Sequence, residues 1–157
     1  MKTRMNRKMQ SLAVLMAILT TSVFAFSLAQ DAAPGINLAE SSELGQYLVD
    51  QDGMALYLFV PDAQGASTCY GDCAANWPAL TVASADALPT AGEGLDATLL
   101  ATVERDDGSL QVTYNGWPLY YFAGDMEAGV TGGQGLGSNW FVVDATGNAV
   151  GMAAGDM

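Results

Sequence analysis

Two segments of the chain share one pattern of apolar and polar positions. Residues 53–62 (GMALYLFVPD) and residues 116–125 (GWPLYYFAGD) carry Gly, Leu, Tyr, Phe and Asp at the same places, at a constant offset of 63 residues. Self-similarity of this kind indicates that the chain contains two copies of one structural unit. We therefore predict two repeats, at about residues 46–62 and residues 110–125.

The residues around each copy indicate a β-hairpin. Each copy starts at a turn pair, Asp52-Gly53 in the first and Asn115-Gly116 in the second. Such pairs permit the positive φ angles of a tight hairpin bend. Strand-like runs precede both turns, at residues 46–49 and residues 110–114. Each repeat is therefore predicted to be a hairpin whose second strand carries the sequence Tyr-x-Phe.

Side chains along a strand alternate between its two faces, so the tyrosine and phenylalanine of each Tyr-x-Phe should face the same core. An aspartate follows each pair, where it can accept backbone N–H groups of the next turn. The alternative is that the tyrosine and aspartate of each repeat bind a ligand. The residues concerned are Tyr57, Phe59 and Asp62 in the first repeat and Tyr120, Phe122 and Asp125 in the second.

The rest of the pattern also favours strands. Residues 99–105 and residues 110–114 flank a turn, and residues 140–144 form a further apolar run. One short helical turn is expected at residues 72–76, with Asp72 as its cap. We predict an all-β fold, a small antiparallel sandwich or partly open barrel built from two hairpin repeats with one short helical turn.

The N-terminus has the order of an export signal. Basic residues lie at positions 2, 4, 7 and 8, residues 11–26 are almost wholly apolar, and Ser27-Leu28-Ala29 offers small residues before a cut at Gln30. The alternative is an uncleaved membrane anchor, but the apolar run is shorter than a membrane span requires, so cleavage is favoured and no span is expected after it. The expected organisation is a signal peptide at residues 1–29, a flexible lead at residues 30–43, one β domain at residues 44–150, and a frayed tail at residues 151–157.

Cleavage would leave a very acidic protein. Four of the five basic residues lie in the signal, whereas all 17 acidic residues follow it, so the mature chain keeps Arg105 as its one basic residue. Such a surface repels nucleic acid and anionic lipids, because it offers no cations to phosphate groups. It favours solubility, and also divalent cations and basic partners.

The chain contains no histidine, which excludes several kinds of site. A Ser-His-Asp or Cys-His arrangement is impossible, and so is an imidazole metal site. No catalytic residue is predicted and no cofactor is expected. If the protein is an enzyme, a metal-dependent oxidoreductase is favoured over a hydrolase.

Two kinds of sulfur side chain offer other chemistry. Cys69 and Cys73 are the only cysteines, and an oxidising compartment favours a disulfide between them, with a redox dithiol as the alternative. Methionine and cysteine are soft ligands that suit copper(I), so Met54 and Met126 are weak candidates for a copper site.

The chain also resembles a known family, at its two repeats and at the segment that contains both cysteines. Its two Tyr-x-Phe-x-x-Asp segments are similar to the Tyr-x-aromatic-x-x-Asp motif of the bacterial secreted repeat of unknown function, many of whose members are predicted lipoproteins. The segment from Cys69 to Leu80, which contains Trp77-Pro78, resembles the part that follows the first repeat of that family. Trp117 belongs to the second copy of the motif. No cysteine lies near the predicted cut, so the lipid anchor does not carry over.

These observations leave two functional hypotheses. The first is an exported acidic module of the cell envelope that binds an envelope protein or polymer without catalysis, as a subunit of a surface assembly for example. The second is an envelope redox or metal-handling protein of the antioxidant type, with copper held by Met, Cys, Tyr or carboxylate groups. Either would act in the periplasm, at the cell surface or outside the cell.

Overall fold

The computed structural model describes residues 35–152 of the chain. The predicted signal peptide and most of the predicted tail lie outside the described residues. No helix among the described residues is long and apolar enough to cross a membrane.

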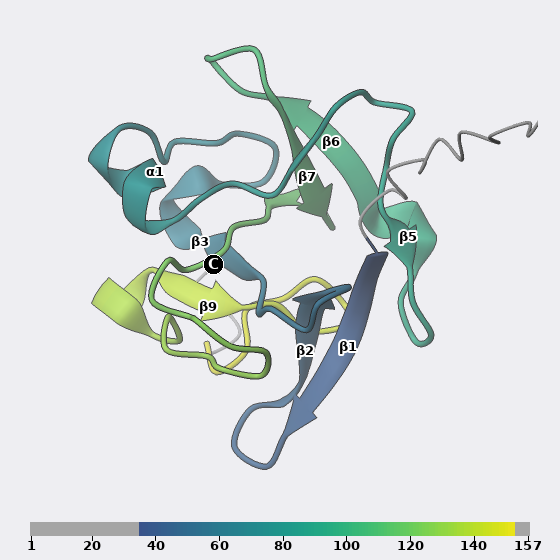
Figure 1. Cartoon of the computed structure of the whole chain (residues 1–157), viewed down its shortest axis with the longest axis vertical. Coiled ribbons are helices and arrows are strands. Elements are labelled where there is room, and N and C mark those ends of the chain that lie inside the picture. Colours follow the sequence, from purple (N-terminus) through teal and green to yellow (C-terminus); the bar gives the residue numbers. More distant parts are fainter. Residues whose placement is uncertain (1–34, 153–157) are drawn as a thin grey trace, which may run out of the picture. The chain divides into compact units, whose positions relative to one another are not determined.

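The described residues form an all-β fold, as the sequence predicts (Figure 1). Within residues 35–152 the helical content is one α-helix and three short 3-10 turns. The strands are β1 (Gly35–Ser41), β2 (Gly45–Asp50), β3 (Tyr57–Phe59), β4 (Thr81–Val82), β5 (Thr90–Ala91), β6 (Leu100–Glu104), β7 (Leu110–Tyr114), β8 (Trp117–Pro118) and β9 (Trp140–Val142); the helical elements are η1 (Val60–Asp62), α1 (Asp72–Asn76), η2 (Ala97–Leu99) and η3 (Leu136–Ser138).

The strands are arranged in three small sheets, none of which closes into a barrel within residues 35–152. The first sheet has the order β2-β1-β5, the second pairs β3 with β9, and the third has the order β4-β7-β6 with β8 also on β7. All of these pairings are antiparallel except that of β1 with β5. Short strands in several small sheets are what a chain with frequent turn residues produces.

The first hairpin differs from the expected one. Residues 30–43 were predicted to be a flexible lead, but Gly35–Ser41 forms β1, which pairs with β2 from Ile36–Asp50 to Ser41–Gly45. The prediction is wrong there because Ile36, which is fully buried, anchors the strand in the core. Leu38, two residues further on, also packs against the core, but so short an alternation beside Pro34 and Gly35 favours a flexible lead when only the sequence is considered.

The hairpin bends lie where predicted, but their second strands diverge. At the first bend, Val49 still bridges Ala55, and the peptide N–H of Gly53 donates to Asp50 O at 3.1 Å. The chain then leaves β2, and β3 pairs with β9 instead. The second hairpin, β7 with β8, is likewise only two residue pairs long. Each aromatic segment therefore stops pairing with the first strand of its own hairpin and can pair with the other repeat.

The helical turn is also where the sequence places it. Helix α1 spans Asp72–Asn76 and ends at Trp77. Its N-cap, however, is Gly71 and not the predicted Asp72, and no side chain caps the helix. Gly71 occupies this position because its φ of 55° is accessible to glycine at little cost.

The apolar side chains pack into two clusters that share the same strands. Along β2 and β3, alternate residues face opposite ways: Leu48, Leu56 and Leu58 enter one cluster, whereas Tyr47, Val49, Ala55 and Tyr57 enter the other. The second repeat divides its side chains in the same manner, with Leu119 in the first cluster and Tyr120 in the second. These strands are buried on both faces, which explains why residues 54–60 are almost continuously apolar.

Candidate functional site

The two repeats meet at the tyrosines of their motifs. The peptide N–H of Tyr57 donates to Tyr120 O at 2.8 Å, and that of Tyr120 donates to Tyr57 O at 2.9 Å. This reciprocal antiparallel bridge joins residues 63 positions apart in the sequence. The two copies of the motif therefore run antiparallel to each other and are hydrogen-bonded at their tyrosines.

Each tyrosine hydroxyl crosses this junction to the aspartate of the other repeat. Tyr57 Oη donates to Asp125 Oδ2 at 2.5 Å, and Tyr120 Oη donates to Asp62 Oδ2 at 2.6 Å. The ligand-binding alternative assumed that the tyrosine and aspartate of one repeat work together. The structure instead pairs them between repeats, and all four residues are buried.

The other oxygen of each aspartate holds the loop that follows its own repeat. Asp62 Oδ1 accepts both the peptide N–H and the hydroxyl of Thr68 at 2.7 Å. Asp125 Oδ1 accepts the peptide N–H of Gly132 at 2.8 Å. As predicted, each aspartate accepts a backbone N–H of the loop after its own repeat, but the donor residue lies six or seven positions after the aspartate. Each aspartate therefore ties its own loop to the opposite repeat.

Burial changes the ionisation of these groups. It raises the pKa of the Tyr57 hydroxyl far above its usual value, and the hydrogen bond to Asp125 raises it further. Burial, with the Asp62 hydrogen bond, raises the pKa of Tyr120 to about 12. Burial also raises the pKa of the Asp62 carboxyl, against the opposing hydrogen bonds from Tyr120 and Thr68. Both hydroxyls stay protonated at neutral pH, where neither can act as a base or nucleophile.

A stack of four rings lies beside the two tyrosines. The rings of Trp77 and Trp140 are parallel, with centroids 3.8 Å apart. Phe59 stacks on Trp140 at 4.1 Å, and Phe122 covers Trp77 at 4.5 Å. The prediction that the Tyr-x-Phe side chains face a common core is confirmed, because both tyrosines are buried in the second apolar cluster and both phenylalanines, which are half-buried, pack against it.

The two tryptophans of the stack are related by the same offset as the two repeats. Trp77 and Trp140 are 63 residues apart, as are the two tyrosines, and each lies edge-on to one of them: Tyr57 at 5.4 Å and Tyr120 at 5.3 Å. Trp140 was missed as a site residue, although the offset of 63 would have found it. Trp117 is buried in the other cluster and is not the counterpart of Trp77.

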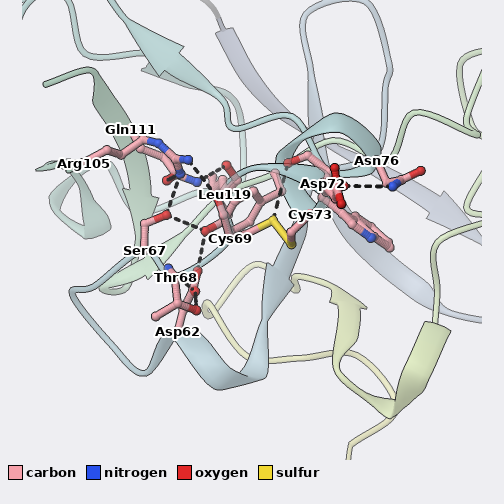
Figure 2. The surroundings of a disulfide bond; sticks show 12 residues. Asp62, Ser67, Thr68, Cys69, Asp72, Cys73, Asn76, Arg105, Gln111 and Leu119 are labelled. Carbon is pink, nitrogen blue, oxygen red and sulfur yellow. Dashed lines mark hydrogen bonds between the residues drawn. A yellow bond between two sulfur atoms is a disulfide. The ribbon is translucent and has the colours of Figure 1, made fainter. Parts of the chain in front are cut away.

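The disulfide lies next to this junction, on the loop after the first repeat (Figure 2). Cys69 and Cys73 are bonded to each other, as predicted, with their Cα atoms 5.3 Å apart. Thr68 and Gly132 donate to equivalent aspartates of the two repeats. The residues that follow them, Cys69 and Gly133, therefore occupy equivalent positions. A Cβ atom on Gly133 would lie 2.7 Å from the ring of Trp77 and 2.9 Å from that of Tyr57, so a side chain cannot fit there.

Arg105 ties the disulfide loop to the third sheet (Figure 2). Its guanidinium donates to Ser67 Oγ at 2.5 Å, Gln111 Oε1 at 2.7 Å and Cys69 O at 2.8 Å. Ser67 in turn shares a hydrogen bond of 2.7 Å with Tyr120 Oη. The sequence offered no reason to assign Arg105 a role beyond charge, yet it links the disulfide loop to the tyrosine of the second repeat.

Comparison with known families agrees with this internal symmetry. A family described as a secreted repeat of unknown function matches residues 39–81 and again residues 101–144, more than half of the chain. The chain belongs to this family. No curated protein and no solved structure matches the chain.

The two matches to the secreted repeat each include one full set of the residues described above. The first contains Tyr57, Asp62 and Trp77, and the second contains Tyr120, Asp125 and Trp140. In this chain each matched unit therefore comprises a hairpin bend, an aromatic segment and a closing tryptophan, and the two units are joined by their Tyr–Asp hydrogen bonds.

The side chains that could ligate a metal ion in this secreted repeat lie as follows in residues 35–152. No group of three or more His, Cys, Asp or Glu side chains in residues 35–152 is placed to hold one. Met54 lies half-buried at the first hairpin bend, and the side chain of Met126 is 84% exposed beyond the second repeat. The sulfur atoms of both cysteines are bonded to each other and cannot serve as thiolate ligands.

Proposed function

We propose that the protein is an exported, non-catalytic module of the cell envelope that binds a basic partner protein through its acidic exterior. Membership of a secreted family supports export. The periplasm, the cell surface and the extracellular medium all remain compatible with this proposal.

The observation that carries the proposal is the position of Arg105. It is the one basic side chain of the described residues, and it is 5% exposed and hydrogen-bonded inside the fold. Acidic side chains such as Glu43, Asp86, Glu93 and Glu127 are exposed. The described surface therefore presents carboxylates without cations, which attracts basic surfaces and repels acidic ones.

The repeat motif supports the non-catalytic part of the proposal. Its tyrosines and aspartates are buried and hydrogen-bonded to one another, so they stabilise the scaffold and cannot reach a substrate. A reaction would need groups at the surface, where the described residues offer carboxylates but no histidine, lysine or arginine.

Charge substitution in cells tests the proposal. The variant E43Q/D86N/E93Q/E127Q removes four exposed charges from side chains that make no hydrogen bonds within the described residues, and E43D/D86E/E93D/E127D keeps all four. We expect cross-linking to recover the wild-type chain and the charge-conserving variant in a complex that dissociates in high salt, and to lose that complex in the neutralised variant. Equal recovery of all three proteins would contradict the proposal.

Metal analysis of the purified protein tests the alternative hypothesis of a redox or metal-handling protein. Metal analysis of the exported chain should give far less than one copper per molecule. Stoichiometric copper, lost on substitution of Met54 or Met126, would favour the redox or metal-handling hypothesis instead.

A further inference from the structure

The stacked pair of Trp77 and Trp140 is a place where the protein can lose a single electron. Indole and phenol are the side-chain groups that give up one electron most readily. The two indole rings are parallel to within 1°, with centroids 3.8 Å apart, so both rings share the positive charge that remains. Phe59 and Phe122 pack against the pair, and aromatic faces attract a neighbouring positive charge. The four rings together therefore stabilise the oxidised pair.

The pair is buried, but its edges reach solvent. Trp77 is 7% exposed and Trp140 is 6% exposed. Their indole N–H groups make no hydrogen bond with the described residues, and no fully buried side-chain nitrogen in residues 35–152 lacks a partner. Both N–H groups are therefore open to solvent. An oxidant in solution can take an electron at these edges without access to a ring face.

Each indole has a tyrosine beside it that can replace the lost electron. Tyr57 lies edge-on to Trp77 at 5.4 Å between ring centroids, and Tyr120 lies edge-on to Trp140 at 5.3 Å. Electrons cross such short distances between neighbouring rings without movement of the chain. Oxidation of the pair can therefore pass inward to either tyrosine.

The tyrosines can give up that electron because a base is in place for their protons. A phenol that loses an electron becomes a very strong acid, so its oxidation requires an acceptor within hydrogen-bond reach. Tyr57 Oη donates to Asp125 Oδ2 at 2.5 Å. Tyr120 Oη likewise donates to Asp62 Oδ2 at 2.6 Å. The hydroxyl of Tyr114, by contrast, donates to a peptide oxygen, which is a far weaker base.

We propose that this cluster is a site of reversible one-electron oxidation by small oxidising radicals that the exported protein meets. The radical takes one electron from the indole pair. One of the two tyrosines returns an electron to the pair and passes its phenolic proton to its aspartate partner, which leaves intact indoles, a neutral tyrosyl radical and a carboxylic acid. A one-electron reductant of the hydroquinone class then reduces the tyrosyl radical, and the aspartate returns the proton.

This activity goes beyond the proposed binding of a basic partner and does not rest on it. The buried tyrosines cannot touch a substrate, but electron transfer needs no such contact, because the electron crosses the rings and the proton stays within one hydrogen bond. The site uses neither a metal nor a thiol, unlike the redox hypothesis drawn from the sequence.

Pulse radiolysis of the mature protein with the azide radical tests the inference, because this radical oxidises indole in preference to phenol at neutral pH. In the wild type, the visible absorption of the indole radical should decay as the near-ultraviolet band of the tyrosyl radical rises, at a rate independent of protein concentration. The rise should be slower in heavy water, because a proton moves with the electron. Added hydroquinone should then remove the tyrosyl band. Absence of that band, or equal rates in the two solvents, would overturn the proposal.

Variants assign the radical to the two tyrosines. Y57F and Y120F should each lower the yield of tyrosyl radical, and Y57F/Y120F should abolish it. Y47F should keep the full yield, since Tyr47 lies in the same cluster but its hydroxyl makes no hydrogen bond within the described residues. In the Y120F background, D125N should slow the transfer to Tyr57 by about 100-fold, a usual contribution of a positioned base. A wild-type yield in Y57F/Y120F would overturn the proposal.

Near-ultraviolet circular dichroism of the stacked pair shows whether each variant is folded before radiolysis. If a variant is unfolded, the comparison of the wild type in water and heavy water decides alone. Loss of the salt-sensitive complex with intact radical transfer would overturn only the basic partner.

Discussion

Removing the hydroxyl of Tyr57 or Tyr120 leaves a buried carboxylate with one donor fewer. A buried acceptor that loses its partner costs about 1–3 kcal/mol. We therefore expect Y57F and Y120F each to lower the free energy of unfolding by that amount, measured by urea denaturation. Tyr47 offers a matched control, since it is equally buried and its hydroxyl makes no hydrogen bond within the described residues. An equal loss in Y47F would show that the cross-repeat hydrogen bonds contribute nothing.

The same hydroxyls make stability depend on alkaline pH. Burial raises the pKa of Tyr57 and Tyr120 above the ordinary value of 10, that of Tyr120 to about 12. Their contribution to stability is complete below pH 10, where both states are protonated, and is lost as the pH rises toward the folded pKa, because only the unfolded state ionises. The free energy of unfolding should fall by about 1.4 kcal/mol per pH unit for each such tyrosine.

Urea titrations between pH 9 and pH 12 measure this slope. In Y120F the slope should be smaller than in the wild type by the share of one tyrosine. An unchanged slope would mean that Tyr120 ionises equally in both states.

At the scale of elements, the loop from Asp62 to Trp77 depends on the disulfide, on Arg105 and on α1. The bond between Cys69 and Cys73 closes a very short loop, so on the chain-entropy model it stabilises the fold by only about 2 kcal/mol. We expect C69A/C73A to unfold at a lower denaturant concentration, with a free energy of unfolding that is lower by about 2 kcal/mol. Reduction should shift the wild type by a similar amount and leave the double variant unchanged. A larger loss would show that the bond also holds the Arg105 hydrogen bonds in place.

At the scale of the whole molecule, neither repeat is complete alone. β3 pairs with β9, β4 pairs with β7, and each motif tyrosine donates to an aspartate of the other repeat. Fragments 35–95 and 96–152 should therefore be unfolded separately and should reassemble when mixed. The near-ultraviolet circular dichroism of the stacked pair Trp77 and Trp140 reports this directly, because each fragment carries one of the two rings. A fragment that folds on its own would contradict the mutual dependence.

The sequence by itself determined the local features of this protein. The offset of 63 located both repeats, turn pairs located both bends, and the alternation of Tyr57 with Phe59 placed their side chains in one core. The helical turn at Asp72–Asn76 was also predicted, although not its cap. These features depend on contacts between near neighbours and on the period of the strand, which the order of residues specifies.

Only the tertiary structure decided which residues meet across the repeats. Tyr57 has an aspartate five residues away, yet it donates to one 68 residues away, because β3 leaves its hairpin and crosses to the other repeat. The parallel pairing of β1 with β5 was equally beyond the sequence, since it depends on segments brought together by packing. A repeated motif specifies two equal halves, but a reciprocal junction between them appears only when both halves are folded against each other.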